Sequence, residues 1–273
     1  MSKSDKMDKT GFQPASYWEA RLSAHYDLQG VGDIGLPVSY NQVLYRVRAS
    51  AFSLVISKLD GQPNDWSVLD VGSGTGFYVD LWLRSGVKAL TGSDITEIAV
   101  RHLSAQYSEA RFIQCDIGQP LPDSVATASF DVVSAFDVLF HIVDDTAYSK
   151  AIANIASMVR DGGYFIFSDN LSDRVLRHGP HQVSRTEAEV RALLSENGLE
   201  VKRVVPMFVL MNDPVRSQSQ IMRKFFSLIY RLAARGEGWG RTIGNCLYPL
   251  ETALIRLMRR GPSTEIFICQ KRA

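Results

Sequence analysis

A run of apolar residues and glycines between Val68 and Gly76 constrains the fold more than any other feature of the chain. Its first part, Ser67–Val71, is short, apolar and β-branched, which predicts a strand buried on both faces. Gly72 and Gly74 then begin a turn that ends at Gly76, where a helical pattern starts. Without Cβ atoms a ligand can lie against the main chain, with the first amides of the helix pointing toward it. The run therefore predicts a nucleotide-binding turn between a strand and a helix.

The spacing of these glycines separates classes of nucleotide site. A dinucleotide-binding turn has Gly-x-Gly-x-x-Gly, whereas the third glycine here comes one residue earlier, and Asp70 stands two residues before the first. The chain contains no Gly-Lys-Ser or Gly-Lys-Thr, which excludes a phosphate-binding P-loop.

Further strands with polar ends follow in order. Ala89–Asp94 ends in an acid about twenty residues beyond the glycines, the position at which α/β nucleotide sites place a carboxylate on the ribose hydroxyls. Arg111–Asp116 ends in a second acid, and Phe130–His141 is a strand that runs into a polar turn. Any one of these acids could instead cap a helix, but a series of them at successive strand ends favours a ligand site.

Together these segments resemble the class I S-adenosylmethionine-dependent methyltransferases of the small-molecule type, over about residues 60–210 and the last strand. The resemblance implies a doubly wound, mostly parallel seven-stranded α/β sheet whose last strand, Glu265–Gln270, is antiparallel between its neighbours. It also implies S-adenosyl-L-methionine as cofactor and S-adenosyl-L-homocysteine as product. In this family the acid at Asp116 accepts from the adenine amino group and Ile117 lies along the ring. The candidate cofactor-binding residues are Asp70, Gly72, Ser73, Gly74, Gly76, Asp94, Ile95, Asp116, Ile117, Phe136 and Val138.

The turn after the fourth strand holds the candidate catalytic residues Asp137 and His141. Val138-Leu139-Phe140-His141-Ile142 is similar to a Val-Leu-x-His-Ile pattern of the family, and a histidine titrates near enough to neutrality to take a hydroxyl proton. The alternative is a structural or cofactor-side histidine. His178 and His181, after the fifth strand, are rival bases.

A magnesium site is a second alternative. Catechol-type methyltransferases hold magnesium with an Asp-Asn pair after the fifth strand and an Asp after the fourth, and Asp169, Asn170 and Asp137 occupy those places. The sequence around His141 instead resembles the metal-independent branch, so we expect no metal.

Composition limits the partners and the compartment. The formal net charge of +1 predicts no nucleic-acid partner, and Cys115, Cys246 and Cys269 lack metal or disulfide spacing. No apolar run has the length of a membrane span, and the N-terminus lacks the hydrophobic region of a signal peptide, so we expect a cytoplasmic protein. The sequence gives no indication of oligomeric state.

Hydrophobic periodicity predicts four parts. Residues 1–13 are expected to be a disordered tail, 14–60 an N-terminal helical cap, and 61–213 with 263–273 the cofactor-binding core. Between the last two strands, where a short turn is usual, residues 214–262 predict a helical hairpin.

Residues 214–260 hold nine Arg or Lys against two Glu. Three interpretations of this charge remain open: solvated faces of two packed helices, a lid over an anionic acceptor, or a surface that approaches acidic lipid. We expect the insertion to govern the acceptor and leave cofactor binding unaffected.

The predicted function is methyl transfer to a small-molecule acceptor, for which an anionic molecule and a lipid-linked molecule both remain open. A hydroxyl oxygen is favoured as acceptor atom because no Asn/Asp-Pro-Pro-Tyr clamp follows the fourth strand. The alternatives are an N- or C-methyltransferase acting on an apolar acceptor at a membrane surface, and a non-catalytic cofactor-binding protein.

Overall fold

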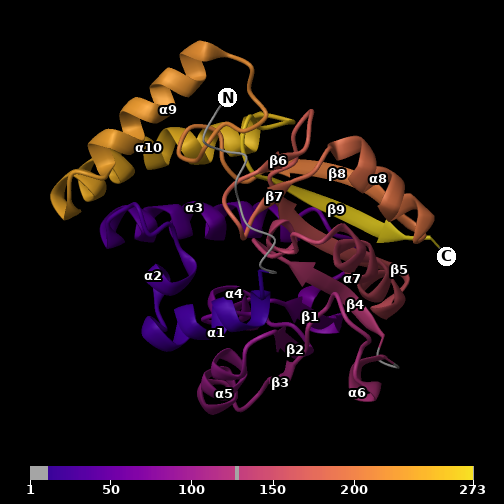
Figure 1. Ribbon diagram of the computed structural model, residues 1–273. Coiled ribbons are helices and arrows are strands. Elements are labelled where there is room, and N and C mark those ends of the chain that lie inside the picture. The colour runs from indigo at the N-terminus through magenta and orange to yellow at the C-terminus, as the bar shows by residue number, and fades with distance from the viewer. Residues whose placement is uncertain (1–11, 127–128, 273) are drawn as a thin grey trace.

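The computed structural model describes residues 12–126 and 129–272, and its centre is a seven-stranded sheet flanked by helices (Figure 1). The strand order is β3-β2-β1-β4-β5-β9-β8, which confirms the predicted fold class. Residues 1–11 of the predicted tail lie outside the described residues. The strands are β1 (Ser67–Val71), β2 (Ala89–Asp94), β3 (Arg111–Gln114), β4 (Phe130–Ala135), β5 (Val159–Asp169), β8 (Leu199–Pro206) and β9 (Glu265–Lys271), and a separate ribbon joins β6 (Leu176–Arg177) to β7 (Val183–Ser184).

Strand direction brings the functional loops together. β1 pairs in parallel with both β2 and β4, and β4 pairs in parallel with β5, so the carboxyl ends of these strands meet at one edge of the sheet. β9 runs antiparallel between β5 and β8, as predicted. In an open α/β sheet the crevice beyond the carboxyl ends is the ordinary place for a ligand.

The helices cover both faces of the sheet (Figure 1). They are α1 (Pro14–Ala24), α2 (Leu28–Val31), α3 (Val38–Ile56), α4 (Phe77–Arg84), α5 (Glu97–Gln106), α6 (Asp123–Ala126), α7 (Asp145–Met158), α8 (Glu187–Glu196), α9 (Gln220–Ala233) and α10 (Glu237–Leu257), with short 3-10 turns at Pro63–Asp65 and Leu139–His141.

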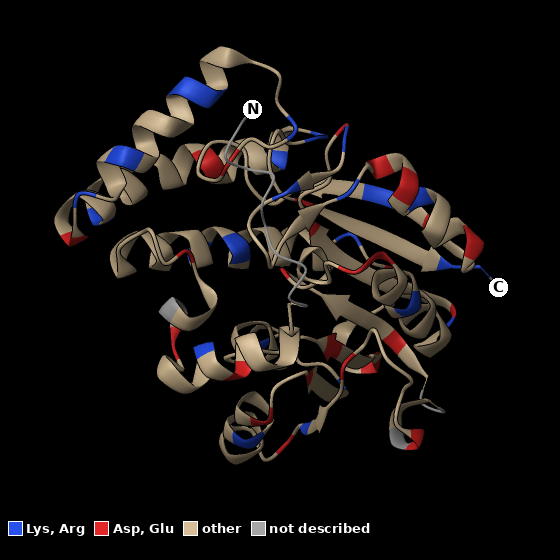
Figure 2. Cartoon of the chain, in the orientation of Figure 1, with Lys and Arg blue, Asp and Glu red and all other residues tan. Residues whose placement is uncertain are grey.

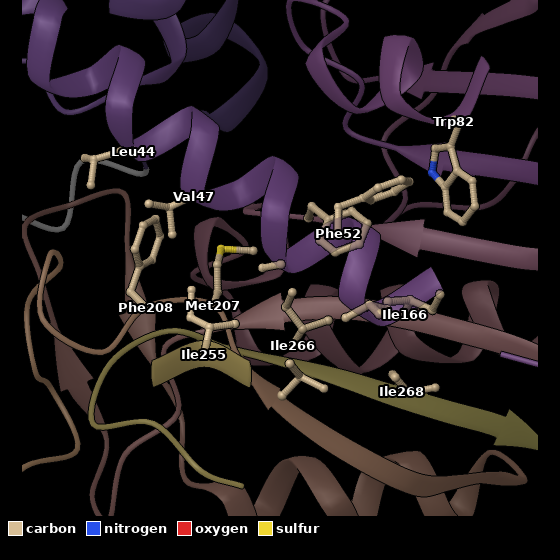
Figure 3. Packing of buried hydrophobic residues seen from close by; sticks show 14 of the residues in the cluster. Leu44, Val47, Phe52, Trp82, Ile166, Met207, Phe208, Ile255, Ile266 and Ile268 are labelled. Carbon is tan, nitrogen blue, oxygen red and sulfur yellow. The ribbon is translucent and has the colours of Figure 1, made fainter. Parts of the chain in front are cut away.

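One face of the sheet packs against α3, α4 and the end of α10. Phe52 of α3 lies against Trp82 of α4 with ring centroids 4.8 Å apart, and both side chains are buried. Figure 3 shows Leu44, Val47 and Phe52 projecting from α3 toward the isoleucines of β5 and β9. The N-terminal helical segment is thus part of the main hydrophobic core.

The other face packs against α7 and α8. Ile152 and Ile155 of α7 and Leu194 of α8 are fully buried in a cluster with Phe165 and Phe167 of β5. Cys269 is a free thiol that is also buried in this cluster.

The insertion forms the predicted pair of helices, α9 and α10, beside α3 (Figure 1). A Cβ on Gly240 would lie 2.6 Å from Pro37, and one on Gly244 would lie 2.9 Å from Val43, so these glycines allow α10 to approach α3 closely. Helix α10 begins at Glu237 and ends at Leu257.

β8 ends at Pro206, and a register shift interrupts its pairing with β9 between Val201 and Arg203. β8 is an edge strand, where an imino residue that cannot donate is tolerated. No helix among the described residues is long and apolar enough to cross a membrane.

Candidate active site

The glycine turn after β1 has the backbone geometry that its sequence predicts. Gly72, Gly74 and Gly76 have φ angles of +72°, +53° and +88°, a region that favours glycine. The amides of Gly72 and Ser73 donate to the carbonyl oxygen of Ser93 at 2.7 and 2.9 Å, which ties the turn to the end of β2. A Cβ on Gly72 would lie 2.4 Å from Val138 of the fourth-strand turn.

A cavity of about 770 Å³ lies beyond the carboxyl ends of the strands. This volume is within the range of about 300–1,000 Å³ that small-molecule sites occupy. The structure brings eleven of the thirteen predicted site residues to its wall: Gly72, Ser73, Gly74, Asp94, Ile95, Asp116, Ile117, Phe136, Asp137, Val138 and His141.

Asp70 and Gly76 do not line this cavity. The Asp70 side chain is only 2% exposed and its Oδ1 accepts from the Ser134 hydroxyl at 2.7 Å, while Trp82 Nε1 donates to that same hydroxyl. Burial raises the pKa of Asp70 to about 7. The pattern located Asp70 correctly on β1, but its side chain supports the turn from beneath.

The two acids at the ends of β2 and β3 differ in their hydrogen-bond partners. Asp94 Oδ2 accepts from the Gly74 amide at 2.8 Å, and its Oδ1 accepts from the amide and hydroxyl of Thr96. Asp116 Oδ1 accepts from the Gly118 amide at 2.9 Å. Asp94 Oδ2 and Asp116 Oδ1 each accept one of these bonds and can accept a second, so both side chains can receive ligand hydroxyl or amino groups from the cavity.

The N-terminal helices close one side of the cavity, which sequence reasoning did not predict. Tyr17, Trp18 and Arg21 of α1 line the wall, and the Tyr26 hydroxyl donates to the Gly74 carbonyl at 3.0 Å. The carboxylate of Glu19 accepts from the first amides of α5, the end of a helix that favours negative charge. The aromatic pair Tyr17-Trp18 was the sequence signal that could have indicated this role.

Arg48 of α3 is a second wall residue that the sequence did not reveal. Its Nε lies 2.7 Å from Asp137 Oδ2, and its guanidinium lies over the rings of Tyr45 and Phe208. Asp137 has a φ of +58°, and its Oδ1 accepts from the Ser168 hydroxyl at 3.1 Å. Because its carboxylate is occupied by a cation, Asp137 is a poor candidate for a base.

His141 is held in one tautomer. Its Nδ1 lies 2.8 Å from the carbonyl oxygen of His181, and since a carbonyl can only accept, Nδ1 carries the proton and Nε2 has the free lone pair. Trp18 and Phe140 pack against the ring, with centroids 4.8 and 4.5 Å away. Burial lowers the pKa of His141 to about 4, so the ring is neutral at physiological pH.

His178 and His181, the two rival bases, differ in their position relative to the cavity. His181 lines the cavity and stacks on Tyr17 at 5.3 Å and on His141 at 5.7 Å. His178 is absent from the cavity wall among the described residues. His181 therefore belongs to the site as the group that orients His141.

The three side chains considered for a magnesium site are not arranged around a common point. Asp137 is paired with Arg48, Asp169 is 2% exposed and does not line the cavity, and Asn170 Oδ1 accepts from the Thr264 hydroxyl at 2.5 Å. Within residues 12–126 and 129–272, no group of three or more His, Cys, Asp or Glu side chains is placed to hold a metal ion. These side chains do not fit the magnesium arrangement.

The helical insertion is absent from the cavity wall. No lining residue described for the cavity comes from 214–262. A Cβ on Gly35 would lie 2.2 Å from the Tyr230 hydroxyl, so α9 touches the chain at Gly35. The residues just before it, 32–34, line the cavity. Among the residues described, helix α1, the end of α2 and the loop after it line this cavity, and the insertion packs beside α3. The interpretation of the insertion as a lid therefore has no support from the cavity wall.

Comparison with known proteins agrees with this geometry. A family model of the methyltransferase domain matches residues 69–167, from β1 to β5. Residues 69–167 are a methyltransferase domain. The expected resemblance to class I methyltransferases is thereby confirmed for the glycine turn, the acidic strand ends and the turn that holds His141.

One curated relative matches a part of the chain over a part of its own sequence. The ubiquinone biosynthesis O-methyltransferase of Albidiferax ferrireducens is 32% identical over 104 residues, which are 37% of this chain and 40% of that protein. The chain thus matches less than half of the length of this curated relative.

Solved structures match over nearly the whole chain. Magnesium protoporphyrin IX methyltransferase from Synechocystis PCC 6803, with bound S-adenosylmethionine, superposes with a TM-score of 0.58 at 15% identity, over 97% of this chain and 100% of that one. The N-methyltransferase NodS from Bradyrhizobium japonicum WM9, in complex with S-adenosyl-L-homocysteine, gives a TM-score of 0.56 at 16% identity, over 96% and 100%. At this identity the likeness shows a shared fold.

Proposed function

We propose that the protein binds S-adenosyl-L-methionine and transfers its methyl group to a hydroxyl oxygen of a small-molecule acceptor. One observation carries the proposal: the glycine turn, the carboxylates of Asp94 and Asp116, and His141 in a fixed neutral tautomer all line the same cavity. The methyltransferase domain and the cofactor-bound neighbours of the same fold support it.

The cavity residues fit the cofactor by the chemistry of their groups. The turn at Gly72–Gly74 exposes main chain at positive φ, which suits the methionine portion. Asp94 would accept from the ribose hydroxyls and Asp116 from the adenine amino group, while Ile95 and Ile117 supply apolar surface for the rings. Bound there, S-adenosylmethionine supplies an electrophilic methyl group on a sulfonium.

His141 would act on the acceptor. Its Nε2 accepts the hydroxyl proton as the bond to the methyl carbon forms, and the resulting positive ring is stabilised by the His181 carbonyl at Nδ1. A pKa of about 4 is sufficient because a hydroxyl that is being alkylated becomes strongly acidic. The proton then passes to water, and Arg48 holds Asp137 away from this transfer.

Isothermal titration calorimetry with S-adenosylmethionine and S-adenosylhomocysteine tests the first half of the proposal. We expect binding of both, and no binding of NAD. Absence of heat with both ligands would overturn the proposal. The acceptor is then sought among hydroxylated small molecules by mass increase of one methyl group, with His141→Ala as the variant that binds the cofactor but transfers slowly.

A further inference from the structure

Exposed apolar side chains gather on the insertion. Nine large hydrophobic side chains are exposed among the described residues, and seven of them belong to α9, α10 and the residue after α10. We call these seven the α9–α10 surface: Ile221, Phe225, Leu228, Trp239, Leu250, Leu257 and Met258. Scattered exposed apolar residues are ordinary on a protein, but a concentration of this kind marks an interaction site.

Helix α9 is amphipathic with its apolar side turned outward. Ile221, Phe225 and Leu228 follow one another at spacings of four and three, which places them on one face, and Ile221 is 82% exposed. Only Ala233 of this helix is buried. A helix that merely packed on the body of the protein would bury this stripe.

Helix α10 carries an exposed apolar stripe of its own. Trp239, Leu250 and Leu257 are separated by eleven and seven residues, again one helical face, and Leu257 is 80% exposed. The opposite face packs on α3 through Gly240 and Gly244. In Figure 1 the two helices extend from the body of the molecule on the same side.

The charges of the insertion have a consistent arrangement. Its two acids are held by backbone amides: Glu237, which is exposed, accepts from the amides of Val38 and Ser39, and Glu251 is buried and accepts from the amides of Val209 and Leu210. Two cations, Arg216 and Arg260, are paired with Glu187 and Glu265. In the part of the chain that the structure describes, the remaining seven have no ion-pair partner: Arg223, Lys224, Arg231, Arg235, Arg241, Arg256 and Arg259.

We propose that the α9–α10 surface docks on the anionic headgroup region of a lipid membrane. Apolar stripes would enter the boundary of the acyl chains, and the arginines and lysine beside them, seen in blue along α9 in Figure 2, would contact the lipid phosphates. A second copy of the chain fits less well, because pairing like surfaces would bring two sets of uncompensated cations together.

The surface lies close to the cavity at one point. Tyr230 of α9 rests against Gly35, next to Ile34, which both lines the cavity and is 80% exposed. The cavity therefore reaches the protein surface beside α9. A docked protein would present this opening toward the lipid, from which an apolar acceptor could enter.

Flotation with vesicles tests the proposal without any activity measurement. We expect the protein to float with phosphatidylcholine vesicles that contain phosphatidylglycerol, to float weakly with phosphatidylcholine alone, and to be released at high salt. Ile221→Gln with Leu228→Gln should weaken partitioning by about tenfold or more. Val175→Gln, at an exposed apolar residue elsewhere, is the matched control and should bind normally.

Charge reversal is the second arm. Lys224→Glu with Arg231→Glu should reduce binding to anionic vesicles by about tenfold or more, since each basic residue near a membrane surface adds to the attraction for anionic lipid. Arg101→Glu with Lys150→Glu changes the net charge equally on other exposed helices and should have a small effect. All four of these substituted residues are exposed, so folding, checked by circular dichroism, should be retained.

Two results would overturn the proposal. One is equal binding of the wild-type protein to neutral and anionic vesicles. The other is a stable dimer in light scattering that Leu228→Gln dissociates, which would assign the surface to a second copy. The α9–α10 surface contributes no residue to the described cavity wall, so the same variants should bind the cofactor normally. Cofactor titration of these variants therefore tests the methyltransferase proposal independently of membrane docking.

Discussion

Arg48 Nε lies 2.7 Å from Asp137 Oδ2, and this ion pair joins the N-terminal helix α3 to the turn after β4. The two side chains are 17% and 24% exposed, so the charges are largely removed from water. Asp137 also has a left-handed backbone conformation at φ +58°. The pair therefore holds a strained turn in place at the wall of the cavity.

Removal of the Arg48 guanidinium should lower the free energy of unfolding. Arg48→Met leaves the Asp137 carboxylate partly buried without its partner, and we expect a loss of about 3 kcal/mol in the free energy of unfolding. Urea denaturation followed by circular dichroism measures it. Arg84→Met, which removes an arginine from an exposed pair with Asp80, is the control and should cost less than about 1 kcal/mol. Equal effects would contradict the structural role of the Arg48 pair.

The two acids near the glycine turn should behave differently toward the cofactor. Asp94→Asn removes a charged acceptor from the cavity wall and should weaken S-adenosylmethionine binding by about tenfold to a hundredfold, as expected for charge-assisted hydrogen bonds of about 1.5–3 kcal/mol. Asp70→Asn should change affinity by less than threefold, because its side chain does not line the cavity. Calorimetry measures the cofactor affinity of both variants. A larger loss of affinity in Asp70→Asn than in Asp94→Asn would contradict the assignment of Asp94 as the residue that contacts the cofactor.

Asp70 should also contribute to the pH dependence of stability. Its folded pKa of about 7 is above the ordinary value, so between pH 4 and 7 the folded state binds more protons than the unfolded state. The stability contribution of the protonated group is complete below pH 4 and is lost as pH rises through 7. Asp70→Asn should therefore gain stability relative to wild type as pH rises from 4 to 8. A constant difference across this range would show that the carboxylate is already ionised.

The pH profile of turnover should reflect the lowered pKa of His141. Because the ring stays neutral down to about pH 4, kcat should not fall as pH decreases from 8 to 6, unlike the case of an ordinary histidine base. His141→Ala should lower kcat by about a hundredfold with cofactor affinity nearly unchanged. A large loss of affinity with normal kcat would make His141 a cofactor-side residue.

The buried carboxylate of Glu251 should stabilise the insertion. It accepts from the amides of Val209 and Leu210 at 2.8 Å, joining α10 to the segment after β8. Glu251→Leu leaves two inner amides without an acceptor, and we expect a loss of about 2–4 kcal/mol in the free energy of unfolding. Thermal and urea unfolding measure this, with the exposed Glu196→Leu as control. Equal stability of the two variants would contradict the assignment.

Several elements could be predicted from local pattern alone. The strands at Ser67–Val71 and Ala89–Asp94, the glycine turn and the acidic strand ends are encoded by residues adjacent in sequence, and parallel pairing brings their ends to one edge. The seven-stranded, mostly parallel sheet and its antiparallel last strand followed from the family resemblance and are confirmed.

Other features depended on contacts that no local pattern encodes. Whether Asp137 is a free carboxylate depends on Arg48, eighty-nine positions away in the chain, and which helices cover the cavity depends on how α1 and the insertion dock. Amphipathic spacing in α9 indicated an apolar face but not whether that face would be buried. The sequence by itself determined which residues stand at the strand ends and turns, because local backbone geometry requires them. Only the tertiary structure decided which side chains meet across the cavity and which apolar faces remain exposed, because those outcomes arise from packing between distant segments.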